Sequence, residues 1–140
     1  MEDWRAKALQ YFPDLQEMIQ NQAGPMGLWI DLSFVLETTY EEQPINEERI
    51  RNVYDYAAWC FAQPQTEDVE TDLSSAVAVC FVENIPLNHF TSEDLHRWMS
   101  VESFEGFENL FRYHLSAAEF QKFSDDFRRK RKQFGGESRV

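Results

Sequence analysis

Carboxylates spaced three residues apart are the first candidates for chemistry in this chain. Glu102, Glu105 and Glu108 repeat at this spacing, and Glu67 and Glu70 form a second pair. On a helix such residues lie on one side, so two carboxylates can hold a divalent metal together, as a metal-dependent hydrolase would require. No set of Lys, Arg or Asn that would grip a triphosphate accompanies them, and the spacing is common by chance among 25 acidic residues. Solvated helix faces are therefore the favoured interpretation.

Histidines offer a second kind of site. His89, Glu93 and His96 fall at i, i+4 and i+7, which brings three metal ligands together if one helix covers them. Thr91 is predicted to cap a helix inside this stretch and so interrupts it. Neither a glycine-rich phosphate loop nor a Cys-x-x-Cys pair occurs. We therefore expect no metal, no cofactor and no enzymatic activity.

Charge is distributed unevenly along the chain. Residues 1–127 carry 24 Asp or Glu against 7 Lys or Arg, a net of −17, whereas residues 128–140 carry a net of +5. An acidic body repels phosphates, so nucleic-acid binding by this part is disfavoured. The basic segment Arg128–Lys132 is an exception, and contact with nucleic acid or a membrane stays open beside the favoured interpretation that it folds back on the acidic body.

Eight carboxylates border two successive connections between predicted helices, and we expect these connections to share one end of the bundle. The eight are Glu41, Glu42, Glu47, Glu48, Glu67, Asp68, Glu70 and Asp72. Exposed charges of one sign steer a partner of the opposite sign and raise the rate of association. The sequence therefore predicts that these residues bind a basic protein partner. The alternative is that the acidity serves only solubility.

Apolar periodicity predicts helices almost throughout. Leu28, Leu32 and Leu36 form a stripe from about residue 27 to 42, and another helix is expected from Leu73 to Asn84. The predicted fold is all-α, a compact irregular bundle of six to eight short helices. It is expected to form a single domain over residues 1–134, followed by a flexible tail at 135–140.

Capping residues mark where several helices should begin. Asn46, Thr91, Ser100 and Ser116 are the expected N-caps, because their side chains accept hydrogen bonds from the first turn. Glu119, three residues after Ser116, completes a capping box.

Composition indicates a folded protein. Hydrophobic residues make up 43% of the chain and aromatic residues 15%, too much for a disordered acidic chain. The N-terminal residues lack the pattern of a signal peptide and no apolar run could cross a bilayer, so we expect a cytoplasmic protein that does not enter the membrane.

Two cysteines and three tryptophans stand within apolar helical stretches. Cys60 and Cys80 are expected to be buried thiols, although a disulfide stays open. Trp29, Trp59 and Trp98 compete with neighbouring residues for burial, so one of them is a candidate for an exposed anchor, with burial favoured for each.

Residues Leu95–Phe104, continuing through Phe111–Ser116, resemble a pattern in a family of small uncharacterised bacterial proteins. This resemblance implies no activity. In type and composition the chain is also similar to immunity proteins that neutralise bacterial toxins. That likeness implies a non-catalytic, acidic protein-binding module.

Overall fold

The computed structural model describes residues 3–68 and 71–140. The chain forms two compact units, Met1–Phe81 and Val82–Val140. In the described residues there are nine α-helices and three 3₁₀ helices and no strand. The all-α prediction is confirmed. The extent of a single domain, residues 1–134 with a flexible tail at 135–140, stays a prediction.

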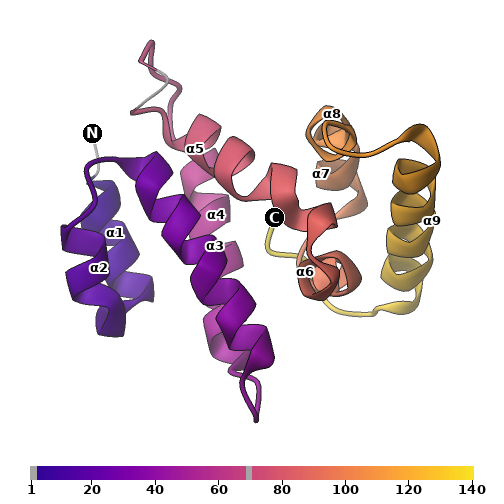
Figure 1. The fold of residues 1–140 in the computed structure, drawn as a ribbon, viewed down its shortest axis with the longest axis horizontal. Helices are drawn as coiled ribbons and strands as arrows, with labels where there is room; N and C mark the ends of the chain where they lie inside the picture. Colours follow the sequence, from indigo (N-terminus) through magenta and orange to yellow (C-terminus); the bar gives the residue numbers. More distant parts are fainter. Residues whose placement is uncertain (1–2, 69–70) are drawn as a thin grey trace. The chain divides into compact units, whose positions relative to one another are not determined.

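In the described residues, the first unit is built from α-helices and one short 3₁₀ helix (Figure 1). In chain order its elements are α1 (Trp4–Tyr11), η1 (Pro13–Leu15), α2 (Gln16–Gln20), α3 (Pro25–Glu41), α4 (Glu47–Phe61) and α5 (Leu73–Cys80). The longest helix of this unit, α3, packs against both α4 and α5. It begins at Pro25, where the missing N–H of proline costs nothing because the first N–H groups of a helix have no partner within it. The stripe Leu28, Leu32 and Leu36 is buried as predicted.

Stacked aromatic rings form the centre of the first unit. The ring of Tyr56 lies between those of Trp59 and Trp29, with centroids 5.9 and 5.4 Å away, and Trp29 stacks in turn on Phe81 at 5.2 Å. The hydroxyl of Tyr56 donates a hydrogen bond to the carbonyl of Trp4 at 3.0 Å, which ties α4 to the start of α1. These contacts fix α1, α3, α4 and α5 around one core.

Both cysteines are buried and free, as expected. Burial raises the pKa of the Cys60 thiol to about 12, because the charged thiolate is disfavoured away from water. This thiol is therefore protonated at neutral pH and behaves as a small apolar side chain.

The second unit is made of shorter helices. Its elements are η2 (Val82–Leu87), α6 (His89–Asp94), η3 (Leu95–Arg97), α7 (Val101–Gly106), α8 (Glu108–Arg112) and α9 (Ala117–Gln133). Its core centres on Phe104, whose ring lies 4.2 Å from Phe127, 5.0 Å from Phe111 and 5.4 Å from Phe123, between centroids. One ring from α7 thereby joins α7, α8 and α9.

Three of the predicted N-caps are confirmed. The side chains of Asn46 and Ser100 accept hydrogen bonds from the backbone N–H of Arg49 and Ser103, both at 3.1 Å. At the start of α9, the side chain of Ser116 accepts from the N–H of Glu119, and the Glu119 carboxylate accepts from the N–H of Ser116. This is the predicted capping box, formed in full.

The predicted cap at Thr91 is wrong. The cap of α6 is Asn88, whose side-chain oxygen accepts from the N–H of Phe90 at 2.9 Å and of Thr91 at 3.3 Å. Thr91 instead lies inside the helix, buried, and its hydroxyl donates to the carbonyl of Ile85 at 2.8 Å. An earlier polar residue thus satisfies the first turn.

Two boundaries differ from the periodic pattern. The helix expected from Leu73 to Asn84 ends at Cys80, and η2 follows with Pro86 inside it. The stretch after Ser100 divides at Phe107 into α7 and α8. Periodicity shows which residues are apolar but does not show where a tight turn interrupts them.

Candidate functional site

Acidity belongs mainly to the first unit. Residues 1–81 contain 15 Asp or Glu and 4 Lys or Arg, a net of −11, whereas residues 82–140 contain 10 and 9, a net of −1. The net charge along the sequence changes sign at residue 128, but the boundary between the two folded units lies at residues 81 and 82. Most of the net negative charge that could attract a basic partner therefore belongs to the first unit.

The basic segment Arg128–Lys132 is engaged within its own unit. Arg128 forms an ion pair with Glu105 and Arg129 with Asp126, both at 3.1 Å. The guanidinium of Arg131 donates to the carbonyl of His96 at 2.9 Å. Two of the five basic side chains are thus paired with carboxylates, and a third donates to a backbone carbonyl.

Four of the eight predicted partner-binding carboxylates come together between α3 and α4. Glu41 ends α3, Glu42 follows it, and Glu47 and Glu48 begin α4; all four are exposed, and we call residues 41–48 the acidic turn. The next cation along the chain is Arg49, which belongs to a different pair: its guanidinium donates to the carboxylate of Asp14. This hydrogen bond is also the main reason why the pKa of Asp14 lies below its usual value.

The remaining predicted residues lie elsewhere. Glu67 and Asp68 are exposed in the connection between α4 and α5, and Glu70 lies outside the described residues. The two connections stand at opposite ends of α4 (Figure 1), a 15-residue helix, so roughly 22 Å of helix separates them. The prediction that they share one end of the bundle is wrong, because a helix of this length joins them.

Asp72 differs from the other acidic residues because it is only 3% exposed. It is the N-cap of α5, and its carboxylate accepts from the N–H and hydroxyl of Ser75 at 3.0 and 2.5 Å and from the N–H of Thr66 at 3.1 Å. These hydrogen bonds, the one from Ser75 first, hold the pKa of Asp72 below its usual value. Its role in this structure is to begin a helix.

An exposed apolar pair continues the acidic turn along α3. Ile30 is 47% exposed and Phe34 is 63% exposed. Because residues 30, 34 and 41 fall at i, i+4 and i+11, they lie on one side of the helix. We call Ile30, Phe34, Thr38 and Glu41 the α3 face. In the sequence, the exposure of Ile30 and Phe34 is indicated by their position outside the leucine stripe of the same helix.

The tryptophans are less exposed than this phenylalanine. Trp29 is fully buried, Trp98 is 6% exposed and Trp59 is half-buried. Burial, the favoured interpretation, therefore holds for Trp29 and Trp98. Phe34 is the exposed aromatic side chain nearest the acidic turn along the chain, and sequence reasoning did not select it.

The carboxylates proposed for a hydrolase are partly used in local ion pairs. Glu105 pairs with Arg128, and Glu108 pairs with Arg112 at 3.4 Å. Within residues 3–68 and 71–140 there is no group of three or more His, Cys, Asp or Glu placed to hold a metal ion. Glu102 and Glu105 are carboxylates of α7 and Glu108 is one of α8, whereas Glu67 lies outside any helix and Glu70 outside the described residues.

The histidines have neighbours of their own in the second unit. His96 lies on η3, after the end of α6, with its Nδ1 3.0 Å from the carbonyl oxygen of Glu93. Burial lowers the pKa of His96. The Nε2 of His114 lies 2.9 Å from the carboxylate of Glu83, which connects the end of α8 to η2. His89 and Glu93 lie on α6 and His96 on η3, so no single α-helix carries the three residues at i, i+4 and i+7.

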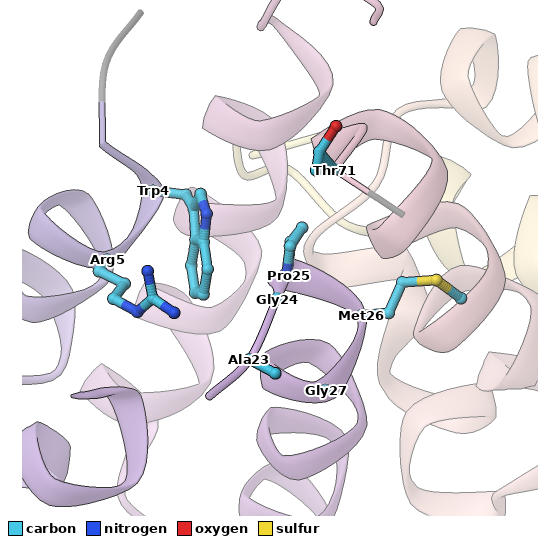
Figure 2. A pocket seen from close by; sticks show the side chains of 8 residues that line it. All are labelled: Trp4, Arg5, Ala23, Gly24, Pro25, Met26, Gly27 and Thr71. Atoms are coloured by element: carbon cyan, nitrogen blue, oxygen red, sulfur yellow. The ribbon is translucent and has the colours of Figure 1, made fainter. Parts of the chain in front are cut away.

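A pocket of about 400 Å³ opens at the start of α3 (Figure 2). Three segments of the first unit line it, with the residues Trp4, Arg5, Ala23, Gly24, Pro25, Met26, Gly27 and Thr71. The Arg5 guanidinium lies over the Trp4 ring, 4.3 Å from its centroid, and donates to the carbonyl of Gln22. Tryptophan, alanine, proline and methionine make most of the wall apolar, and Arg5 is the charged residue in it.

In the parts of the chain that the structure describes, no helix has the length and apolar character needed to cross a membrane. No protein-family model, curated protein or solved structure was found to match the chain.

Proposed function

We propose that this chain is a non-catalytic module that binds a basic protein partner through the acidic turn and the α3 face. The observation that carries the proposal is the juxtaposition of four exposed carboxylates with the exposed Phe34 and Ile30. Carboxylates steer a basic surface over long distances, and an aromatic side chain buried on contact slows dissociation. The two features supply different parts of one binding event.

The absence of basic residues in this part of the sequence supports the proposal. Between Lys7 and Arg49 the chain has no Lys or Arg, so all of α3 and the acidic turn lack a positive side chain. A basic partner thus meets no like charge from this stretch. Solubility alone requires dispersed charge, and it does not call for an exposed apolar pair beside the acids.

The resemblance in type to immunity proteins implies one class of partner, a basic bacterial toxin. We propose this class as the first to test. Toxin neutralisation of this kind needs tight binding and no chemistry, which agrees with a surface built from carboxylates and an aromatic anchor.

The test compares two variants with equal changes in net charge. In one, Glu41, Glu42, Glu47 and Glu48 all become Gln. In the control, Glu93, Glu102 and Glu137 become Gln and Asp125 becomes Asn, which neutralises four carboxylates of the second unit.

We expect wild type and control to retain the same basic protein from a lysate, whereas the quadruple Gln variant loses it. With the purified partner, the association rate of wild type should fall as salt rises, because screening shortens the reach of the charges. Phe34→Ser should mainly raise the dissociation rate. Equal association rates for the two quadruple variants at low salt would contradict the proposal.

A further inference from the structure

The pocket at the start of α3 is a separate feature from the acidic turn. The pocket lies at the N-terminal end of α3 and the turn at its C-terminal end, and 17 residues of helix correspond to about 25 Å. A ligand in the pocket therefore need not touch the proposed protein-binding surface, and each can be tested without the other.

The chemistry of its lining contrasts with that of the unit that contains it. The first unit has a net charge of −11, but none of the eight described lining residues is acidic and one, Arg5, is basic. Within the described residues Arg5 forms no ion pair with a carboxylate. Because the pocket wall holds Arg5 and no acidic residue among the described lining residues, it attracts an anion.

Two contacts hold the arginine in place. Its guanidinium stacks on Trp4, and one of its terminal nitrogens, Nη2, donates to the carbonyl of Gln22. A guanidinium has five N–H donors, so others stay available to a ligand. Figure 2 shows Arg5 and Trp4 on one side of the pocket and Pro25 across from them at the start of α3, whereas the Met26 side chain extends away from Arg5 and Trp4. The cation thus sits beside a flat aromatic wall.

We propose that the pocket binds a small aromatic carboxylate. Its carboxylate pairs with Arg5, because the planar guanidinium matches the two carboxylate oxygens. Its ring packs against the indole of Trp4 and the apolar ring of Pro25. A volume of about 400 Å³ is within the range of pockets that hold small molecules.

The experiment titrates the full chain with naphthalene-2-carboxylate and, separately, with naphthalene-2-carboxamide, an uncharged molecule of the same shape. Binding is followed by NMR at the indole N–H of Trp4 and the backbone N–H groups of Met26 and Gly27. We expect saturable, one-to-one shifts at these positions with the carboxylate. The carboxamide should bind at least about tenfold more weakly, the scale of a lost charged hydrogen bond.

Two variants locate the charge that matters. Arg5→Gln should weaken binding of the carboxylate at least about tenfold, whereas Arg51→Gln, an equal charge change at an exposed position of α4, should leave it unchanged. The wild-type comparison of acid with amide does not depend on how well either variant folds. Equal affinity for acid and amide, an effect of Arg51→Gln equal to that of Arg5→Gln, or shifts centred away from Trp4 and Gly27 would each overturn the proposal.

Discussion

Asp72 illustrates how two carboxylates of one acidic segment can have opposite roles. It is buried and accepts three hydrogen bonds at the start of α5, whereas Glu67, five residues earlier, is exposed. Removing a buried acceptor leaves its hydrogen-bond donors without a partner, whereas at an exposed site water takes the place of the acceptor. The two residues should therefore respond differently to the same substitution.

Asp72→Ala should lower the free energy of unfolding by about 1–2 kcal/mol, the range for losing a good N-cap. Glu67→Ala is the control and should change it by less than about 0.5 kcal/mol. Urea titration at pH 7 measures both. Equal effects would mean that the cap contributes no stability.

The same residue predicts a dependence on pH. Its folded-state pKa lies below the unfolded value near 3.8, so its contribution to stability is present above that pH and is lost as pH falls through the lower, folded-state value. The stability difference between wild type and Asp72→Ala should therefore be constant from pH 7 to about pH 5 and shrink below about pH 4. A difference that stayed constant to pH 2 would show that the hydrogen bonds do not depend on the charge.

Ser116 provides a second test of an individual residue. Ser116→Ala should cost about 1 kcal/mol, because it removes the side-chain half of the capping box at α9. Ser116→Gly should cost less, since glycine tolerates the cap conformation. Denaturant titration followed by circular dichroism distinguishes them, and an alanine variant as stable as wild type would contradict the importance of the cap.

At the scale of the elements, α3 has two apolar surfaces, of which one is buried and the other exposed. Leu28, Leu32 and Leu36 enter the core, while Ile30 and Phe34 are exposed on the α3 face. The leucine stripe could be predicted from its spacing. The position of Phe34 outside this stripe makes it a candidate for exposure, but a sequence does not show which of two apolar sides of a helix its neighbours will cover.

The helix caps also show how far local sequence can predict structure. Ser116 and Glu119 form a reciprocal pair within four residues, so local sequence is sufficient to identify the start of α9. Thr91 has a suitable side chain for a cap, but its hydroxyl is used by Ile85, and Asn88 begins the helix. Likewise, Trp4, Gly24 and Thr71 meet in one pocket only through tertiary packing, which no local pattern encodes.

A matched pair of phenylalanines tests the packing of elements. Phe104→Ala should destabilise the protein by about 3–5 kcal/mol, because it opens a cavity where α7, α8 and α9 meet. Phe34→Ala should change stability by less than about 0.5 kcal/mol, since Phe34 is largely exposed. Thermal or urea unfolding compares them, and a similar loss in both variants would contradict the assignment of core and surface.

At the scale of the whole molecule, charge is partitioned between the two units. The first carries a net of −11 and the second a net of −1, with acidic and basic side chains paired along α9. Repulsion among like charges opposes a compact state, so it should weigh on the first unit much more than on the second.

Salt should therefore stabilise the two units unequally. Between about 0.1 and 1 M NaCl the screening length falls from roughly 10 to 3 Å, which weakens repulsion within the first unit. Hydrogen exchange should show larger gains in protection for the amides of α4 than for those of α9. Equal gains in both helices would point to a general effect of salt on hydration.

The stretch from Lys7 to Arg49 without a basic residue has a practical consequence for mapping the surface. Trypsin has no site within it, so α3 and the acidic turn remain on one long peptide, and amine-reactive cross-linkers have nothing there to attack. Acylation and ubiquitination of lysine likewise cannot occur within this stretch. Carbodiimide coupling and cleavage after glutamate are the reagents that match it, and a partner's lysines would supply the amines.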